Sequence, residues 1–142
     1  MRVPTRTRYG IRAMVDIAIH RTEEPIHVNL LARRLEISKN YLENLMLILK
    51  RNGLVTSSRG PKGGYSLTRH PADIRLPEIF VALEGSETLF YCVDCPDDCP
   101  HSNHCASRDL LKSLGEAMIS TLSSITLEKM TEWQIIKMEQ ET

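Results

Sequence analysis

The sequence predicts a mainly α-helical protein with a small β-hairpin, namely a winged helix-turn-helix followed by a long C-terminal dimerisation helix. Three features indicate this class: two adjacent helical patterns, a basic glycine-rich turn directly after them, and a later helix with a wide apolar stripe. The chain has 142 residues, of which 42% are hydrophobic and 25% charged. These values are typical of a folded protein with a real core.

Local signals predict three helices in the first half of the chain. Apolar residues recur at steps of three and four over 7–20 and again over 29–35, with a polar stretch between. Ser38 is a good N-cap and Asn52-Gly53 is a typical end signal, so a third helix is expected between them. A helix, a short turn and a second, capped helix form the helix-turn-helix order.

A β-hairpin is expected directly after this motif. Residues 54–58 and 65–68 have the composition of strands, and the turn between them contains three glycines. Arg59 and Lys62 make the tip of this wing basic, which suits contacts to phosphates or the minor groove. Gly63 and its glycine neighbours would let the backbone come close to the sugar-phosphate chain.

The second half is expected to contain a short helix over 76–83, a cysteine-rich loop over 88–107, a long helix over 108–127 and a last short helix over 130–138. A loop of that length indicates a function or a bound group. The stripe of the long helix is wider than so small a chain can cover, which predicts a homodimer, although packing against the chain's own first helix is an alternative. The expected domains are 1–85 for DNA binding, 86–107 for the cluster-binding loop and 108–142 for dimerisation.

Charge is distributed unevenly along the chain. Residues 1–75 contain 14 Lys and Arg against 6 Asp and Glu, whereas residues 76–142 contain 4 against 12. A basic first half suggests a polyanionic partner, although a solvated basic face without a partner is the alternative. We also expect a cytoplasmic protein with no membrane contact, because the sequence has neither an apolar run of about 18 residues nor a secretory signal.

The start of the second helix-turn-helix helix is where base edges would be read in the major groove. Ser38, Lys39, Asn40 and Glu43 are exposed there in the predicted pattern. Asparagine can pair with adenine, and glutamate can accept from cytosine N4. An acid that faces DNA is repelled by phosphates, so Glu43 is either a specificity residue or an ordinary solvated glutamate.

All four cysteines lie within fourteen residues, in the pattern Cys92-x2-Cys95-Pro-x2-Cys99-Pro-x4-His104-Cys105. Disulfides are disfavoured in a cytosolic chain. Structural zinc and an iron–sulfur cluster both suit these donors, and spacing does not separate them. A cluster between the DNA-reading half and the dimerisation helix would be well placed to act as a sensor.

Several segments together resemble one regulator family. They are the stretch Arg8-Tyr9-Gly10-Ile11-Arg12-Ala13-Met14, the triplets Tyr41-Leu42-Glu43 and Gly53-Leu54-Val55, the wing from Arg59 to Leu67, and Leu83-Glu84-Gly85. They resemble the iron–sulfur regulators that include IscR, NsrR and RirA. The resemblance implies a homodimeric winged-helix regulator of a double-stranded DNA operator. It also implies that Glu43 helps to discriminate DNA sites and that Arg59 contacts DNA.

The same resemblance implies that Cys92, Cys99 and Cys105 hold an iron–sulfur cluster, with [2Fe–2S] favoured over [4Fe–4S] and zinc less favoured. The histidine that completes the IscR-type site falls at Arg108, and the acidic ligand of NsrR-type proteins falls at Arg8. Neither arginine can ligate. The candidates for the fourth ligand are Cys95, His104, His101 or a nearby aspartate.

Two other function classes are considered. A zinc or iron–sulfur protein without a specific DNA-binding role is the alternative, and it would bind DNA weakly and without sequence preference. An enzyme is not expected, because the sequence shows no nucleophile–base pair and the glycines over 60–64 lack the Gly-Lys-Ser/Thr ending of a phosphate loop.

Overall fold

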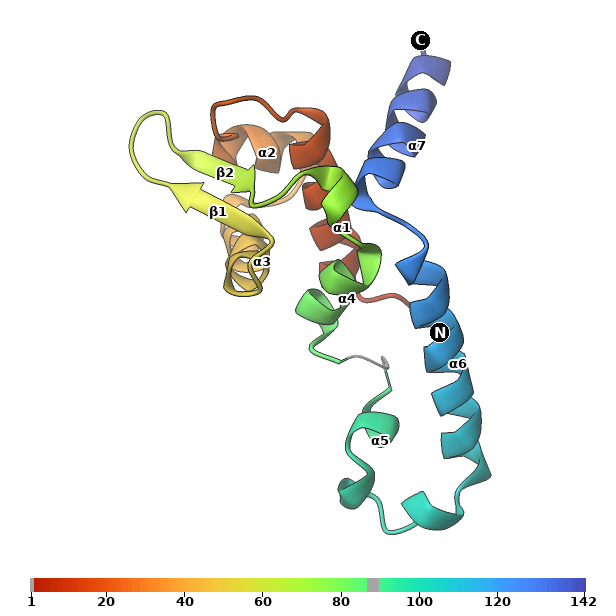
Figure 1. Cartoon of the computed structure of the whole chain (residues 1–142). Coiled ribbons are helices and arrows are strands. Elements are labelled where there is room, and N and C mark those ends of the chain that lie inside the picture. Colours follow the sequence, from red (N-terminus) through yellow and green to blue (C-terminus); the bar gives the residue numbers. More distant parts are fainter. Residues whose placement is uncertain (1, 87–89) are drawn as a thin grey trace.

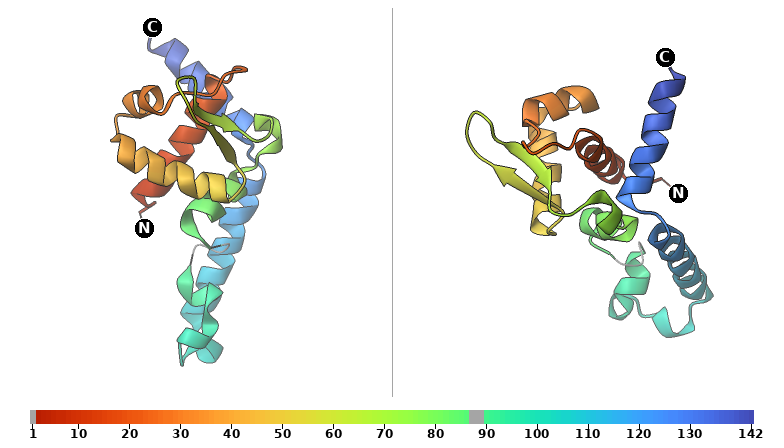
Figure 2. Two further views of the ribbon diagram at one scale, coloured as in Figure 1. Left: turned by 90° about the vertical axis from the view of Figure 1, so that its left-hand side faces the viewer. Right: turned by 45° about the horizontal axis from the view of Figure 1, so that its top comes forward.

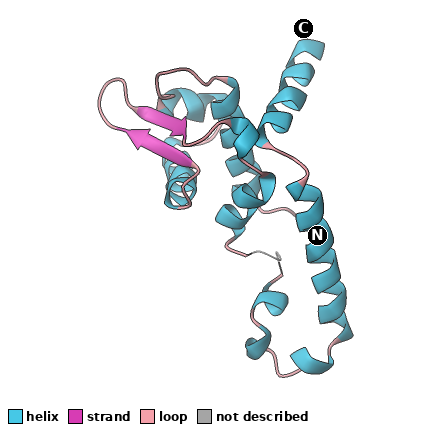
Figure 3. Cartoon of the chain, in the orientation of Figure 1, coloured by secondary structure: helices cyan, strands magenta, loops and turns pink. Residues whose placement is uncertain are grey.

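The computed structural model describes residues 2–86 and 90–142 of the chain. Helices dominate this part, and a single antiparallel hairpin projects from one side (Figures 1 and 3). The helices are α1 (Thr5–Ile19), α2 (Val28–Leu35), α3 (Lys39–Arg51), α4 (Leu76–Glu84), α5 (Tyr91–Asp94), α6 (Ala106–Ser123) and α7 (Leu127–Gln140). The strands are β1 (Val55–Ser58) and β2 (Gly64–Leu67), and three 3₁₀ turns are η1 (Pro71–Asp73), η2 (Pro96–Asp98) and η3 (Ser102–His104).

The core lies where α1 meets α2, α3 and α4. The apolar positions that recur along α1 are fully buried, as at Met14 and Ile17, and they pack with Leu42 and Met46 of α3. Burying a side chain of this size stabilises the fold by roughly 1.5–3 kcal/mol. The predicted fold class is therefore confirmed, since the first half forms the helix-turn-helix with its hairpin.

Helix α3 and the wing form as the sequence predicts. The Ser38 hydroxyl caps α3 by accepting a hydrogen bond from the Tyr41 N–H at 3.1 Å. Strands β1 and β2 pair from Val55 opposite Leu67 to Ser58 opposite Gly64. The loop before α2 extends this pairing, because Ile26 and Tyr65 exchange two backbone hydrogen bonds of 2.9 Å.

The C-terminal helices differ from the prediction. The helix expected over 108–127 ends at Ser123, and the expected short last helix over 130–138 begins already at Leu127. The break is fixed by the segment before α4, because the Leu76 N–H donates to the Ile125 carbonyl at 3.1 Å and the Leu127 N–H to the Ile74 carbonyl at 2.8 Å. The Thr126 hydroxyl then caps α7 by accepting from the Lys129 N–H at 3.2 Å.

Helices α6 and α7 take different directions from this break. Helix α7 packs along α1, whereas α6 runs away from the winged-helix part with α5 beside it (Figures 1 and 2). Only Gly115 of α6 is buried, and Leu114 of its predicted stripe is exposed, as is Leu110 alongside it. The alternative for the long helix was packing against the chain's own first helix. In the structure it is α7 that packs against α1.

The cysteine-rich segment is more regular than the predicted loop. Between Phe90 and Ser107 the chain forms α5, η2 and η3. The expected start of this loop at Thr88 lies outside the described residues. Across the part of the chain that the structure describes, we find no helix with the length and apolarity needed to cross a membrane.

Candidate nucleic-acid interface and cysteine segment

The first turns of α3 form an exposed polar face. The side chains of Ser38, Lys39, Asn40 and Glu43 are all on the surface, whereas Leu42 and Leu45 on the opposite face are buried. Lys39 and Glu43 lie one turn apart, with Nζ and Oε1 separated by 3.9 Å. The ammonium group of Lys39 therefore offsets part of the repulsion that Glu43 would feel from phosphates.

Glu43 also influences the hairpin electrostatically, through Tyr65 of β2. Burial, with the charge of Glu43 as the second cause, raises the pKa of the Tyr65 hydroxyl on β2 above its ordinary value. Tyr65 therefore stays neutral at physiological pH.

The wing projects its two cations into solvent but uses one of its glycines internally. Arg59 is exposed, and Lys62 lies 4.0 Å from Glu24 with both side chains largely solvated, so this ion pair contributes little. Gly63 is buried in the turn, where its N–H donates to the Gly60 carbonyl at 2.9 Å. Gly63 therefore closes the turn that carries the two cations of the wing.

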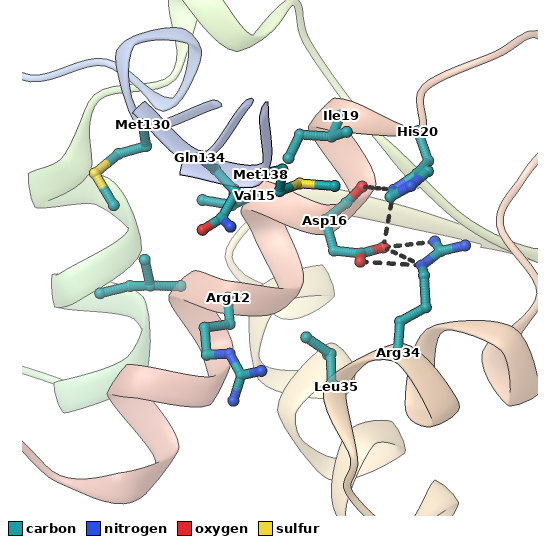
Figure 4. Close-up of a pocket in the computed structure, with 11 residues that line it drawn as sticks. Arg12, Val15, Asp16, Ile19, His20, Arg34, Leu35, Met130, Gln134 and Met138 are labelled. Carbon is teal, nitrogen blue, oxygen red and sulfur yellow. Dashed lines mark hydrogen bonds and ion pairs between the residues drawn. The ribbon is translucent and has the colours of Figure 1, made fainter. Parts of the chain in front are cut away.

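A cavity of about 410 Å³ lies between α1, α2 and α7 (Figure 4). At one end, the Asp16 carboxylate accepts from Arg34, with both oxygens 3.0 Å from Nε and Oδ1 2.5 Å from Nη2. The His20 ring adds a contact of 3.4 Å between Nδ1 and Asp16 Oδ1. This cluster has no signature in the sequence, because the acid and the arginine are eighteen positions apart.

We expect Asp16→Asn to lower the free energy of unfolding by about 2 kcal/mol, because it leaves the half-buried Arg34 guanidinium without its charged acceptor. Urea unfolding followed by circular dichroism measures the change. Glu132→Gln is the matched control, since its pair with Lys129 is half-exposed on both sides and should contribute little. Equal stability of the two variants would contradict a structural role for the Asp16 pair.

The four cysteines lie on successive short turns of the segment beside α6. Cys92 is in α5, Cys95 joins α5 to η2, Cys99 ends η2, and Cys105 caps the start of α6. All four thiols are free and half-exposed. The hydroxyl of Tyr91 donates to the Asp98 carboxylate, and this bond raises the pKa of Tyr91 above its usual value.

The chemistry of these donors suits a thiophilic metal or an iron–sulfur cluster, but their arrangement does not present a finished site. Within residues 2–86 and 90–142, no three His, Cys, Asp or Glu side chains come together in a way that could hold a metal ion. His101 directly precedes η3 and His104 is its last residue, and both are exposed. Binding a cluster at Cys92, Cys99 and Cys105 would therefore require these turns to rearrange.

The exposed face of α3, the capped turn before it and the basic wing define a winged-helix transcription regulator. The chain belongs to the Rrf2 family, whose profile, described as iron-dependent transcriptional regulator, matches residues 3–132. Members of this family are regulators rather than enzymes, which confirms the expectation that this protein is not an enzyme.

Relatives and solved structures agree with this assignment. The chain is 36% identical to protein rrf2 of Nitratidesulfovibrio vulgaris over 89% of its length and 85% of the relative. It is 37% identical to the HTH-type transcriptional regulator IscR of Xenorhabdus nematophila over 94% of its length and 81% of that protein. These matches confirm the resemblance to IscR-type regulators.

Two solved structures share the fold over nearly the whole chain. The structure of CymR, the global cysteine regulator of B. subtilis, matches with a TM-score of 0.75 and 31% identity, covering 94% of this chain and 98% of CymR. IscR of T. potens matches with a TM-score of 0.74 and 33% identity, covering 93% of this chain and 87% of that protein.

Proposed function

We propose that this protein is a homodimeric regulator that binds a double-stranded DNA operator, and that an iron–sulfur cluster on Cys92, Cys99 and Cys105 sets its operator affinity. The observation that carries the proposal is the presence of four free thiols on one segment, directly between the winged-helix half and α6. Such a cluster would supply a group that responds to iron, oxidants or nitric oxide. The names of the IscR relatives support this choice.

The DNA-binding part of the proposal is supported by where charge and polarity are exposed. In this proposal Ser38, Lys39, Asn40 and Glu43 face the major groove, and the wing with Arg59 and Lys62 follows the phosphate backbone. The core of the unit lies behind α3, so these side chains are free to meet DNA. Gly63 contributes by holding the wing turn closed.

The homodimer is supported by the uncovered face of α6. Leu110 and Leu114 are 68% and 39% exposed on a helix that leaves the body of its own chain. Exposed apolar side chains on one face of a helix are stabilised by packing against a second helix. In the proposed dimer, α6 packs against the α6 of a second copy, which places two wings for two half-sites.

The test uses the full chain purified without oxygen. Iron and sulfide analysis with a visible spectrum measures the cluster, sedimentation measures the mass, and selection from randomised duplexes followed by a salt titration measures DNA recognition. We expect a coloured dimer that enriches a palindromic sequence. A colourless protein whose binding to the selected DNA does not change with iron and sulfide would contradict control by a cluster. Weak binding without sequence preference would favour a metal-binding protein without a specific DNA-binding role.

Arg59→Ala should weaken binding to the selected duplex and reduce the slope of log K against log salt by about 1, because one phosphate contact is lost. The loss should be similar for specific and unrelated DNA. Lys129→Ala is the control, since Lys129 pairs with Glu132 on α7, away from the proposed DNA-binding face. An unchanged slope in Arg59→Ala would remove Arg59 from the interface.

A further inference from the structure

Arg108 is the first lysine or arginine of the chain after Arg75, so the stretch between them carries only acidic and neutral side chains apart from two histidines. It lies in the first turn of α6 and is half-buried. Its side chain folds back onto α5, where Nε donates to the carbonyl of Cys92 at 3.3 Å and Nη2 reaches the carbonyl of Val93 at 3.5 Å.

The position of this arginine is unfavourable for α6 itself. The first turn of a helix carries a partial positive charge, so a cation there is disfavoured. The carbonyls of Cys92 and Val93 belong to the one-turn helix α5 and carry the opposite partial charge, which attracts a cation. The hydrogen bonds to α5 therefore compensate for the unfavourable position of the Arg108 cation in α6.

The same residue also touches the last cysteine through its backbone. The Arg108 N–H donates to the carbonyl of Cys105 at 3.1 Å, within the cap of α6. One residue thus contacts the main chain of both the first and the last cysteine of the segment. A planar guanidinium can bond two neighbouring carbonyls at once, which a lysine ammonium cannot do with the same geometry.

We propose that Arg108 is a positioning residue that closes the cysteine segment, holding the turn with Cys92 against the start of α6 beside Cys105. The consequence for cluster loading rests on the proposed function, whereas the closure of the segment does not. Arg108 thereby acts on the arrangement of the thiols and is not itself a ligand.

Hydrogen exchange on the metal-free, reduced chain tests the closure directly. In Arg108→Ala, the amides of Val93 and Cys95 should exchange roughly 10-fold faster, because the contacts that hold α5 are lost. In Arg108→Lys, the exchange rates of these amides should lie between those of the wild type and Arg108→Ala. Lys112 is exposed one turn further along α6, and Lys112→Ala should exchange like the wild type. Unchanged exchange of α5 in Arg108→Ala would overturn the proposal, with α1 and α3 amides as the reference for intact folding.

A second measurement follows the two thiols themselves. In a Cys95→Ser, Cys99→Ser chain, a bimane reagent that fluoresces only after bridging two thiols reports how often Cys92 and Cys105 meet. Arg108→Ala should lower the bridging yield at least about 5-fold by reducing their effective concentration. An equal yield would contradict the closure.

Loading of the four-cysteine chain with iron and sulfide, followed by its visible spectrum, separates this proposal from the proposed function. We expect slower and less complete loading in Arg108→Ala than in the wild type or Lys112→Ala. If the wild type takes up no cluster, the proposed function fails while the exchange and bridging results still decide the role of Arg108. If Arg108→Ala loads like the wild type, the effect on the thiols is overturned even where a cluster forms.

Discussion

Gly64→Ala is expected to lower the free energy of unfolding by about 3 kcal/mol. The loss has two causes, a clash with a rigid neighbour and an unfavourable backbone angle. A Cβ at this position would lie 2.1 Å from the carbonyl oxygen and 2.4 Å from the carbonyl carbon of Ile26. Both atoms belong to the backbone, so no side-chain rotation relieves the clash. Either β2 or the loop before α2 must move.

The movement would break the pairing that attaches the wing to the body. Ile26 and Tyr65 exchange two backbone hydrogen bonds next to the point of close approach. Once these are lost, the hairpin keeps its own turn and its contacts with α3 through β1, but β2 is no longer tied to the loop before α2. Operator affinity should therefore fall in Gly64→Ala even at temperatures where the protein stays folded.

Gly53→Ala is the matched control for this prediction. Gly53 also has a positive φ, of 73°, but no atom lies within 4 Å of the position that its Cβ would occupy. Its substitution should cost only about 1 kcal/mol of backbone strain. Urea unfolding measures both variants, and a loss in Gly64→Ala no greater than that in Gly53→Ala would show that the loop yields without cost.

The elements that the sequence predicted correctly are those whose signals are local. Ser38 begins α3 as an N-cap, and the turn of the wing falls where the glycines cluster, because each signal acts within a few residues. The break between α6 and α7 was predicted a few residues too late, for the opposite reason. Its position depends on backbone hydrogen bonds that join Ile125 and Leu127 to a segment about fifty residues earlier, and the apolar pattern continues across it.

The candidate site divides in the same way. Exposure of Lys39, Asn40 and Glu43 follows from helical periodicity and was predicted. Contacts between groups far apart in the sequence were not predicted, because spacing does not show which elements become neighbours. Examples are the side-chain pair of Asp16 and Arg34 and the bond from Arg108 to the Cys92 carbonyl. For the thiols, the sequence supplies the donor chemistry but not the arrangement that would bring three of them together.

Replacing Cys92 by serine is expected to abolish the response of operator binding to iron and sulfide. If a cluster couples to DNA binding with a typical allosteric free energy, its loading changes the operator affinity of the wild type by about 5–150-fold. A serine hydroxyl is a poor ligand for iron–sulfur clusters because it is not the soft thiolate they require. The operator affinities of the variant with and without iron and sulfide should therefore differ by less than about 2-fold.

The comparison with Cys95→Ser decides which thiols take part. Cys95 lies between α5 and η2 and is not among the three cysteines assigned to the cluster. If His101, His104 or an aspartate completes the site, Cys95→Ser keeps the spectrum and the response of the wild type. If Cys95 is the fourth ligand, its replacement shifts the spectrum and weakens loading, as does that of Cys99 or Cys105.

The measurement is a titration of the selected duplex by each variant, without oxygen, before and after incubation with iron and sulfide. Binding of unrelated DNA serves as the internal standard, since all thiol variants keep the basic wing and should retain it. Because Cys92 and Cys95 are both half-exposed and belong to one short segment, loss of folding affects the two variants alike. A Cys92→Ser chain that still responds like the wild type would contradict the cluster as the source of control.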